Sequence, residues 1–333
     1  MKPSTVIGID IGGTALKIGQ FLADGACVNQ TTLPTPQPPH PQAMVELIAA
    51  AIEQLDPKPN HRAIGVGTPG PTDPSGRIAL IGINLLGWRE VPLADLLEAK
   101  LGLPTFVAND ANCAGLGESW LGAGRNFQNL ILLTLGTGVG GAIILNNQLF
   151  TGSYGAAGEL GLITIDADGD PCNSGNNGSL EQHLSVQAIK RKTQKTPTEL
   201  AKLAASGDKT ALAFWEQYGK DLGAGLASLI YVLTPEAILI GGGISASAEF
   251  FLPSTKKEIE KRVVGISRME SQLLTAELGN QAGMVGAAKL AWENLQTATS
   301  RLGEATASPN KSNPTKVGWV KPPLHPTKVI QQK

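Results

Sequence analysis

Two glycine-rich turns in this chain each follow an apolar stretch, and turns of this kind are typical of phosphate-binding sites. The first is Asp10-Ile11-Gly12-Gly13-Thr14, and the second is Leu135-Gly136-Thr137-Gly138. Glycine lets the backbone come close to a polyphosphate, and the exposed N–H groups then bind the anion. One copy alone fits an ordinary hairpin equally well, but two copies favour a phosphate-binding hairpin used twice.

Further residues near these turns extend the predicted nucleotide site. Asp10 ends its strand and is expected to hold Mg²⁺ through water, while Lys17 either reaches a phosphate or remains a solvated or bridging lysine. A third glycine turn follows the apolar stretch 236–240 and predicts close approach of the backbone to a nucleoside. The predicted nucleotide-binding residues are Asp10, Gly12, Gly13, Thr14, Lys17, Thr134, Gly136, Thr137, Gly138, Gly241, Gly242 and Gly243.

The pair Asn109-Asp110 stands directly after the apolar stretch 105–108. Asn and Asp both cap helices and occupy turns well, so a cap is one interpretation of the pair. Phosphoryl transfer to a hydroxyl also needs a base that accepts the hydroxyl proton, and Asp110 is the candidate for that base. On the residues alone, both interpretations remain open.

Length and composition describe a globular protein with two lobes. The chain has 333 residues, 42% of them hydrophobic and 17% charged, with a formal net charge of −1. This length exceeds what one hydrophobic core usually supports, and the near-zero charge predicts no nucleic-acid or membrane partner. The three cysteines are far apart and odd in number, and no leader or membrane-spanning stretch is recognisable, so we expect a cytoplasmic protein.

Strand and helix patterns alternate along the chain, which predicts an α/β fold. A strand hairpin is expected over 5–11 and 16–22, further strands over 63–68, 105–108 and 236–240, and helices over 42–55, 114–121, 212–233 and 282–295. We assign 1–113 to an N-terminal lobe, to which the helix 282–296 returns, and 114–281 to a C-terminal lobe. Residues 297–333 lack hydrophobic periodicity and are predicted to be a flexible tail.

Six short motifs, taken in order, make the chain resemble the ROK family (repressor, open reading frame, kinase) over roughly residues 5–295. They are Asp10-Ile11-Gly12-Gly13-Thr14, Gly67-Thr68-Pro69-Gly70, Asn109-Asp110-Ala111-Asn112, Leu135-Gly136-Thr137-Gly138-Val139-Gly140-Gly141, Gly158-Glu159-Leu160-Gly161 and Gly241-Gly242-Gly243. The resemblance implies a two-lobed, actin-like ATPase fold made of duplicated ribonuclease-H-like halves, with the active site in the cleft between the lobes. It also implies ATP and Mg²⁺ as cofactors, a hexose substrate phosphorylated at its 6-hydroxyl, and a homodimer.

The resemblance also implies roles for individual residues. Asp110 matches the general base, and Asn109 matches the asparagine that binds the sugar ring hydroxyls. Glu159 and Glu181 match two glutamates that contact the sugar, and Gly70 and Asn84 are expected beside it. For Glu181, an exposed helix carboxylate without a binding role is the alternative.

The chain departs from the family where many members bind zinc. Leu162 stands at the position of a zinc-binding histidine, and of three cysteine positions only Cys172 is kept, with Ser174 and Ser179 at the others. Structural zinc requires four nitrogen or sulfur ligands, so we expect no zinc here. The loop is still expected to fold over the sugar.

Glucokinase activity is the leading expectation from the resemblance, with a kinase for fructose, mannose or an N-acetylhexosamine as its main rival. Polyphosphate is an alternative phosphate donor. The family's repressors carry a helix-turn-helix ahead of the first strand, where this chain has none, so a repressor is disfavoured. A sugar-sensing regulator without catalysis is a further alternative, against which the intact Asp10 and Asp110 argue.

Overall fold

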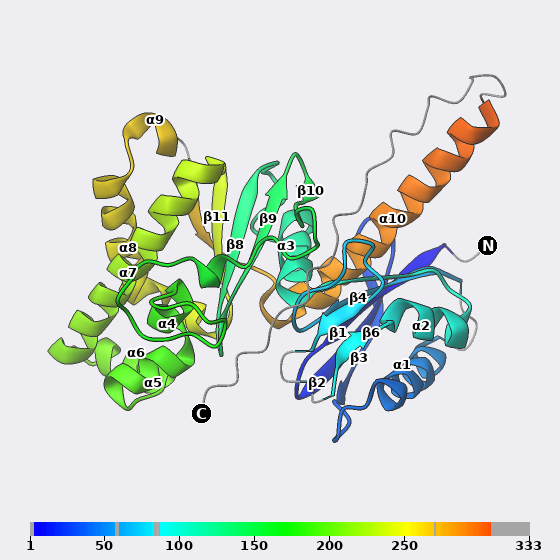
Figure 1. Cartoon of the computed structure of the whole chain (residues 1–333), viewed down its shortest axis with the longest axis horizontal. Helices are drawn as coiled ribbons and strands as arrows, with labels where there is room; N and C mark the ends of the chain where they lie inside the picture. Colours follow the sequence, from blue (N-terminus) through cyan, green and yellow to red (C-terminus); the bar gives the residue numbers. More distant parts are fainter. Residues whose placement is uncertain (1–2, 57–59, 83–84, 86, 270, 308–333) are drawn as a thin grey trace, which may run out of the picture. The chain divides into compact units, whose positions relative to one another are not determined.

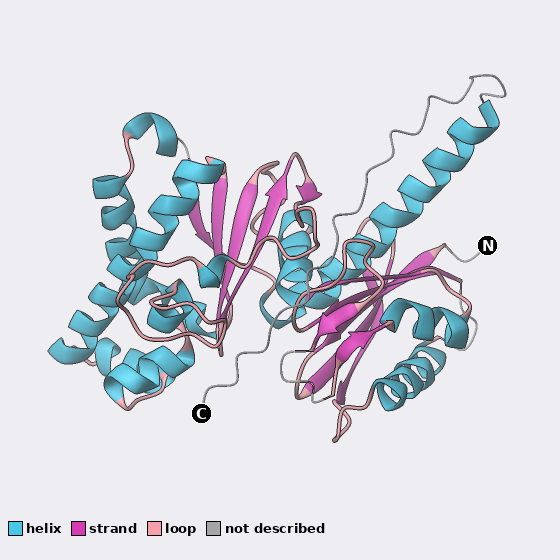
Figure 2. Cartoon of the chain, in the orientation of Figure 1, coloured by secondary structure: helices cyan, strands magenta, loops and turns pink. Residues whose placement is uncertain are grey.

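Two five-stranded sheets with the same topology organise the chain. The structure, a computed structural model, describes residues 3–56, 60–82, 85, 87–269 and 271–307. The chain divides into two units after Leu295, and the first unit contains both sheets. Figure 2 shows how helices flank each sheet.

The first sheet has the order β3-β2-β1-β4-β7. It consists of β1 (Thr5–Ile11), β2 (Ala15–Phe21), β3 (Cys27–Pro34), β4 (His61–Thr68) and β7 (Thr105–Asn109). The pairs β1–β2 and β2–β3 are antiparallel, whereas β1–β4 and β4–β7 are parallel. The predicted hairpin is therefore present, and the parallel strands deliver Gly67 and Asn109 to the edge where Asp10 lies.

The second sheet repeats this pattern with the order β10-β9-β8-β11-β12. It consists of β8 (Leu130–Leu135), β9 (Val139–Leu145), β10 (Gln148–Leu149), β11 (Ala237–Gly241) and β12 (Gln272–Thr275). Again three strands pair antiparallel and two join in parallel. This duplication is that of the two-lobed, actin-like fold, as predicted. A small ribbon of β5 (Ala79–Ile81) and β6 (Arg89–Val91) is added to the first half.

Helices cover both faces of each sheet because the central strands β1, β4, β8 and β11 are buried along almost their whole length. In the first half, α1 (Pro41–Leu55) and α2 (Leu93–Leu101) pack on one face, and α10 (Ala282–Ala307) packs its buried Met284 and Ala288 on the other. In the second half, α7 (Lys209–Leu233) and α8 (Ala248–Arg262) cover one face, and α3 (Asp110–Trp120) packs Leu116 on the other. The remaining helices are α4 (Leu180–Leu184), α5 (Val186–Thr193), α6 (Pro197–Ala205) and α9 (Gly265–Arg268).

The helices α3 and α10 lie between the two sheets and cross in direct backbone contact (Figure 1). A Cβ atom on Gly286 would overlap the carbonyl oxygen of Cys113, and one on Gly117 would overlap that of Ala282. Glycine is required at this crossing because no side chain fits between the helices. The crossing places the first residue of α10, Ala282, beside Gly117 near the end of α3, and Gly286 beside Cys113 in the first turn of α3.

Several predicted boundaries differ from those in the structure, among them the start of the helix expected over 212–233, which begins at Lys209. The helix expected over 114–121 begins at Asp110, because Asn109 caps it. The last helix, expected to end at 295, continues to Ala307, so residues 297–307 are helical, while 308–333 lie outside the described residues. Among the described residues, no helix has the length and apolarity needed to cross a membrane.

Candidate active site

A cleft of about 540 Å³ lies where the carboxyl ends of the central strands of both sheets meet. Its lining includes nearly all the residues predicted from the sequence: Asp10, Gly12, Gly13, Lys17, Gly70, Asn109, Asp110, Thr134, Gly136, Thr137, Gly138, Glu159, Glu181, Gly241, Gly242 and Gly243. Two are not among them. Thr14 is exposed, with its carbonyl oxygen bonded to the backbone N–H of Thr35, and Asn84 lies outside the described residues.

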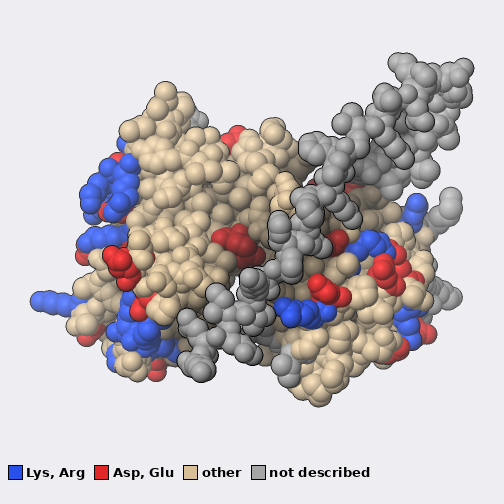
Figure 3. All heavy atoms as spheres, viewed as in Figure 1, with Lys and Arg blue, Asp and Glu red and all other residues tan. Residues whose placement is uncertain are grey.

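The cleft is strongly acidic. Within the described residues, the carboxylates of Asp10, Asp110, Glu118, Glu159 and Glu181 line it, and Lys17 is its only cation. Figure 3 shows Asp and Glu recessed at the centre of this face, with Lys and Arg on the surface at either side. A polyphosphate can therefore enter only with a cation that offsets the acidic charge.

Asp110 lies at the first position of α3, directly after the capping residue Asn109, and it lines the cleft. Its Oδ1 accepts the N–H of Ala111 at 2.8 Å. Burial above all, together with the nearby Asp10 and Glu159 carboxylates, raises the pKa of Asp110 to about 6, although the Ala111 hydrogen bond opposes this rise. A carboxylate with a pKa near 6 is ionised at neutral pH and still a far better proton acceptor than an ordinary aspartate.

Asn109 serves as the helix cap and also faces the cleft, so the two interpretations of the Asn-Asp pair are compatible. Its Oδ1 accepts the N–H groups of Ala111 and Asn112 at 2.9 and 3.1 Å, and its Nδ2 donates to the carbonyl oxygen of Gly70 at 3.1 Å. The cap fixes the side chain, and the bond to Gly70 joins the ends of β4 and β7.

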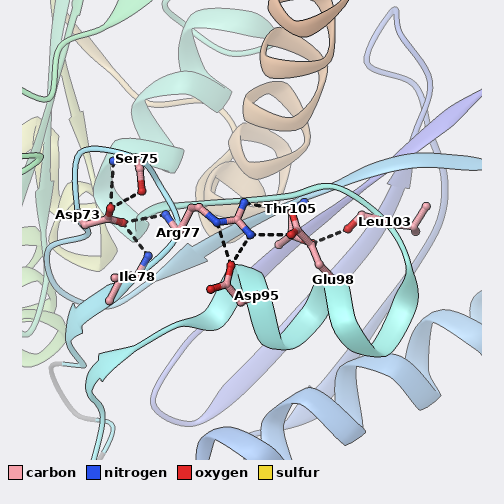
Figure 4. Close-up of polar contacts among 8 residues, drawn as sticks. All are labelled: Asp73, Ser75, Arg77, Ile78, Asp95, Glu98, Leu103 and Thr105. Carbon is pink, nitrogen blue, oxygen red and sulfur yellow. Dashed lines mark hydrogen bonds and ion pairs between the residues drawn. The ribbon is translucent and has the colours of Figure 1, made fainter.

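The loop after Gly70 is held by the polar network drawn in Figure 4. Asp73 accepts the backbone N–H groups of Ser75, Arg77 and Ile78, which closes the loop into a tight turn. The Arg77 guanidinium then bonds to Asp95 and Glu98 on α2, and Glu98 accepts the N–H of Thr105 at 2.9 Å. The loop that carries Gly70 is thereby anchored to the start of β7, the strand that ends at Asn109.

Glu159 and Glu181 approach the cleft from the second half. Both residues line the cleft, where burial raises the pKa of Glu159 and the Glu181 carboxylate raises it further. Glu181, on α4, accepts the N–H of Val139 at 2.9 Å through Oε2. Glu181 is therefore not the exposed helix carboxylate of the alternative interpretation, since its side chain is fastened to the second glycine turn.

The glycine turns present their backbones to the cleft as the spacing predicts. The first closes through the N–H of Gly12 and the carbonyl of Ala15 at 2.9 Å, and the second through Gly136 and Gly138 at 2.9 Å. Gly242 has φ +81°, and a Cβ there would overlap the backbone of Leu135, so the third turn packs on the second. Lys17 donates to Asp10 Oδ2 at 2.7 Å across the first hairpin, which explains its place in the cleft.

Polar contacts hold the loop in which the family's zinc ligands are missing. Asn176 Nδ2 donates to the carbonyl of Leu162 at 2.9 Å, and Thr164 bonds to Asn176 Oδ1 at 3.1 Å. Cys172 is buried; hydrogen bonds from Ser174 and Ser179 outweigh burial and lower its pKa. Within the ranges described, no three His, Cys, Asp or Glu side chains are grouped to hold a metal ion.

Sequence reasoning missed one wall of the cleft, which consists of Glu118 and the segment from Ala276 to Gly283. Gly279 and Gly283 in this segment resemble the glycine turns that were recognised, but no apolar strand of the expected kind precedes them directly. Glu118 sits inside a helix, and only the fold reveals what its carboxylate contacts.

Comparison with known proteins places this cleft among sugar kinases. The ROK family profile matches residues 6–294. A glucokinase of Streptomyces coelicolor is 35% identical over 311 residues, which cover 86% of this chain and 97% of the relative.

Two solved structures extend the comparison. The ROK family glucokinase of Streptomyces griseus, in complex with glucose and AMPPNP, is 34% identical with a TM-score of 0.73, over 87% of this chain and 99% of its own. An inorganic polyphosphate/ATP-glucomannokinase of Arthrobacter sp. strain KM is 30% identical with a TM-score of 0.61, over 89% of this chain and 99% of its own.

Proposed function

Because the chain belongs to the ROK family, we propose that it transfers the γ-phosphoryl group of ATP to the 6-hydroxyl of a hexose, with glucose as the preferred substrate. The observation that carries this proposal is the position of Asp110. Its carboxylate lies in a cleft whose lining combines hydrogen-bonding side chains, at Asn109 and Glu159, with the backbones of three glycine turns.

In the proposed reaction, Asp110 accepts the proton of the 6-hydroxyl as that oxygen attacks the γ-phosphorus. The new oxygen–phosphorus bond forms while the bond to ADP breaks, and the proton stays on Asp110 until it is released to water. Asn109, Gly70, Glu159 and Glu181 bind and orient the sugar through its hydroxyls, together with Asn84, which lies outside the described residues.

The glycine turns supply the phosphate site, and Gly241–Gly243 face the nucleoside. Asp10 suits Mg²⁺, because carboxylate oxygens are the ligands that this ion prefers, and its Oδ1 has no donor among the described residues. When bound, Mg²⁺ would offset the phosphate charge in this acidic cleft. Lys17 forms an ion pair with Asp10 Oδ2, so we propose that Lys17 orients the Asp10 carboxylate.

The direct test is an ADP-release assay with glucose, mannose, fructose, N-acetylglucosamine and N-acetylmannosamine, each with ATP and with polyphosphate as donor. We expect glucose and ATP to give the highest kcat/KM. A higher kcat/KM for another hexose or donor would overturn the substrate assignment. Tight hexose binding without turnover of any pair would favour the sugar-sensing regulator.

A further inference from the structure

Glu118 is a fully buried carboxylate in the last turn of α3, the helix that begins with Asp110. It forms no ion pair with a lysine or arginine in the part of the chain that is described. Its oxygens instead accept three backbone N–H groups, from Ala123 at 2.9 Å, Glu277 at 3.1 Å and Leu278 at 2.8 Å. Hydrogen bonds to an ionised acceptor are stronger than those between neutral groups.

Two of these donors belong to the segment that joins β12 to α10. This segment contributes Ala276, Gly279 and Asn280 to the cleft wall. The N–H of Ala276 also donates to the carbonyl of Ile240 at 3.0 Å, which places the segment directly beside Gly241–Gly243. The two segments together form one side of the cleft.

The segment has few other anchors. Glu277, Gly279 and Asn280 are exposed, and the Glu277 side chain forms an ion pair with Arg125 in which both partners are about half exposed. Exposed ion pairs of this kind contribute little to stability. Glu118 is therefore the main polar attachment of the segment. The backbone at Gly122 also packs directly against the Glu118 carboxylate, because a Cβ at Gly122 would collide with it.

We propose that Glu118 is a positioning residue for the nucleotide. Its carboxylate fixes the 276–280 wall against α3, so the surface that faces the nucleoside is held by the helix that presents Asp110 to the sugar. The inference rests on the proposed function in one respect, namely that the ligand of this wall is a nucleotide. It assigns Glu118 no contact with the sugar and no role in proton transfer.

Titration calorimetry with MgADP and, separately, with glucose tests this role. In Glu118→Gln, an NH₂ group replaces one carboxylate oxygen and cannot accept the backbone N–H groups that this oxygen accepts. We therefore expect the Kd for MgADP to rise about 10-fold. The Kd for glucose should change by less than about 2-fold, because the sugar side is held by Asn109 and the Arg77 network. The matched control is Glu277→Gln, which removes only the exposed ion pair of the same segment and should change neither Kd.

A second pair of variants covers the case in which Glu118→Gln fails to fold. Leu278→Pro removes one donor N–H at a residue whose φ of −80° suits proline, and Leu278→Ala keeps that N–H while also shortening the side chain. We expect weaker MgADP binding in the first and not in the second.

Three outcomes would overturn the inference. They are an unchanged Kd for MgADP in Glu118→Gln, an equal loss of affinity for MgADP and glucose, and equal MgADP binding by the two Leu278 variants. If the parent protein binds glucose but no MgADP, the proposed function fails instead, and the two failures are thereby distinguished.

Discussion

The ionised carboxylate of Asp110, the proposed base, destabilises the folded state. Replacing Asp110 should therefore stabilise the protein and remove its activity. Burial, with the Asp10 and Glu159 carboxylates nearby, raises the pKa of Asp110 from 3.8 to about 6. At about 1.4 kcal/mol per pKa unit, the ionised carboxylate destabilises the folded state by roughly 3 kcal/mol at neutral pH. Asparagine removes the charge and keeps an oxygen that can accept the N–H of Ala111.

The effect on stability should depend on pH with a definite sign. Below about pH 4, the Asp110 carboxyl is protonated in the folded and the unfolded chain, so the charge makes no difference. As the pH rises from 4 to 6, Asp110 ionises first in the unfolded chain, because its pKa is lower there. The folded state, in which Asp110 keeps its proton longer, therefore loses stability relative to the unfolded state over this range. We expect Asp110→Asn to exceed the parent in stability by about 1 to 3 kcal/mol at pH 7.5 and to match it near pH 4.

Thermal unfolding at pH 4, 6 and 7.5 measures this difference, and steady-state kinetics measures kcat, which we expect to fall by roughly 10² to 10⁴. Asp73→Asn is the control of opposite sign. Hydrogen bonds from Ser75, Ile78 and Arg77 lower the pKa of Asp73 despite its partial burial, so this variant should be less stable than the parent at pH 7.5. An Asp110→Asn variant that is less stable at pH 7.5, or that keeps most of the parent's turnover, would refute this account of Asp110.

Three further predictions concern the sugar side of the cleft and the missing zinc ligands. Glu181→Ala should weaken glucose binding about 10-fold and reduce any compaction that glucose causes in small-angle scattering, since hydrogen bonds to a carboxylate in a dry cleft are strong; parent-like affinity and compaction would contradict its role. Arg77→Met should lower stability by about 1 kcal/mol and weaken glucose binding, because the Gly70 loop loses its anchor to α2; glucose affinity equal to that of the parent would contradict this. Purified protein should contain no stoichiometric zinc and keep its melting temperature in chelator, and one zinc per chain in elemental analysis would contradict this.

Local signals in the sequence were sufficient to predict the duplicated hairpins. The apolar runs before Gly12 and Gly136 and the glycines themselves specify a strand followed by a close turn, whatever the rest of the chain does. The Asn109-Asp110 pair was likewise predictable as a strand end, because polar residues follow an apolar run. The helix itself was predicted to begin at 114 and begins at Asp110, because Asn and Asp are common both in helix caps and in loops.

Contacts between distant segments were not predictable in this way. Nothing near Glu118 in the sequence indicates that its carboxylate binds the backbone of Glu277 and Leu278, which lie beyond the whole second sheet. The helix over 297–307 was missed because Ala, Thr and Ser there form no hydrophobic stripe, although alanine favours a helix on its own. Thr14 was assigned to the site from its place in the turn; in the structure it is exposed and is not among the residues that line the cleft.

The central claim is that the protein transfers the γ-phosphoryl group of ATP to a hexose, with Asp110 as the proton acceptor. ³¹P NMR of the reaction mixture tests this claim most directly. With MgATP and glucose, the parent protein should convert the γ-phosphate resonance into one sugar phosphate ester, in equal amount to the ADP formed. Asp110→Asn, at the same concentration and with the same glucose affinity, should form this ester at least about 100-fold more slowly. Release of ADP with inorganic phosphate in place of the ester, or ester formation at the parent's rate by Asp110→Asn, would contradict the account.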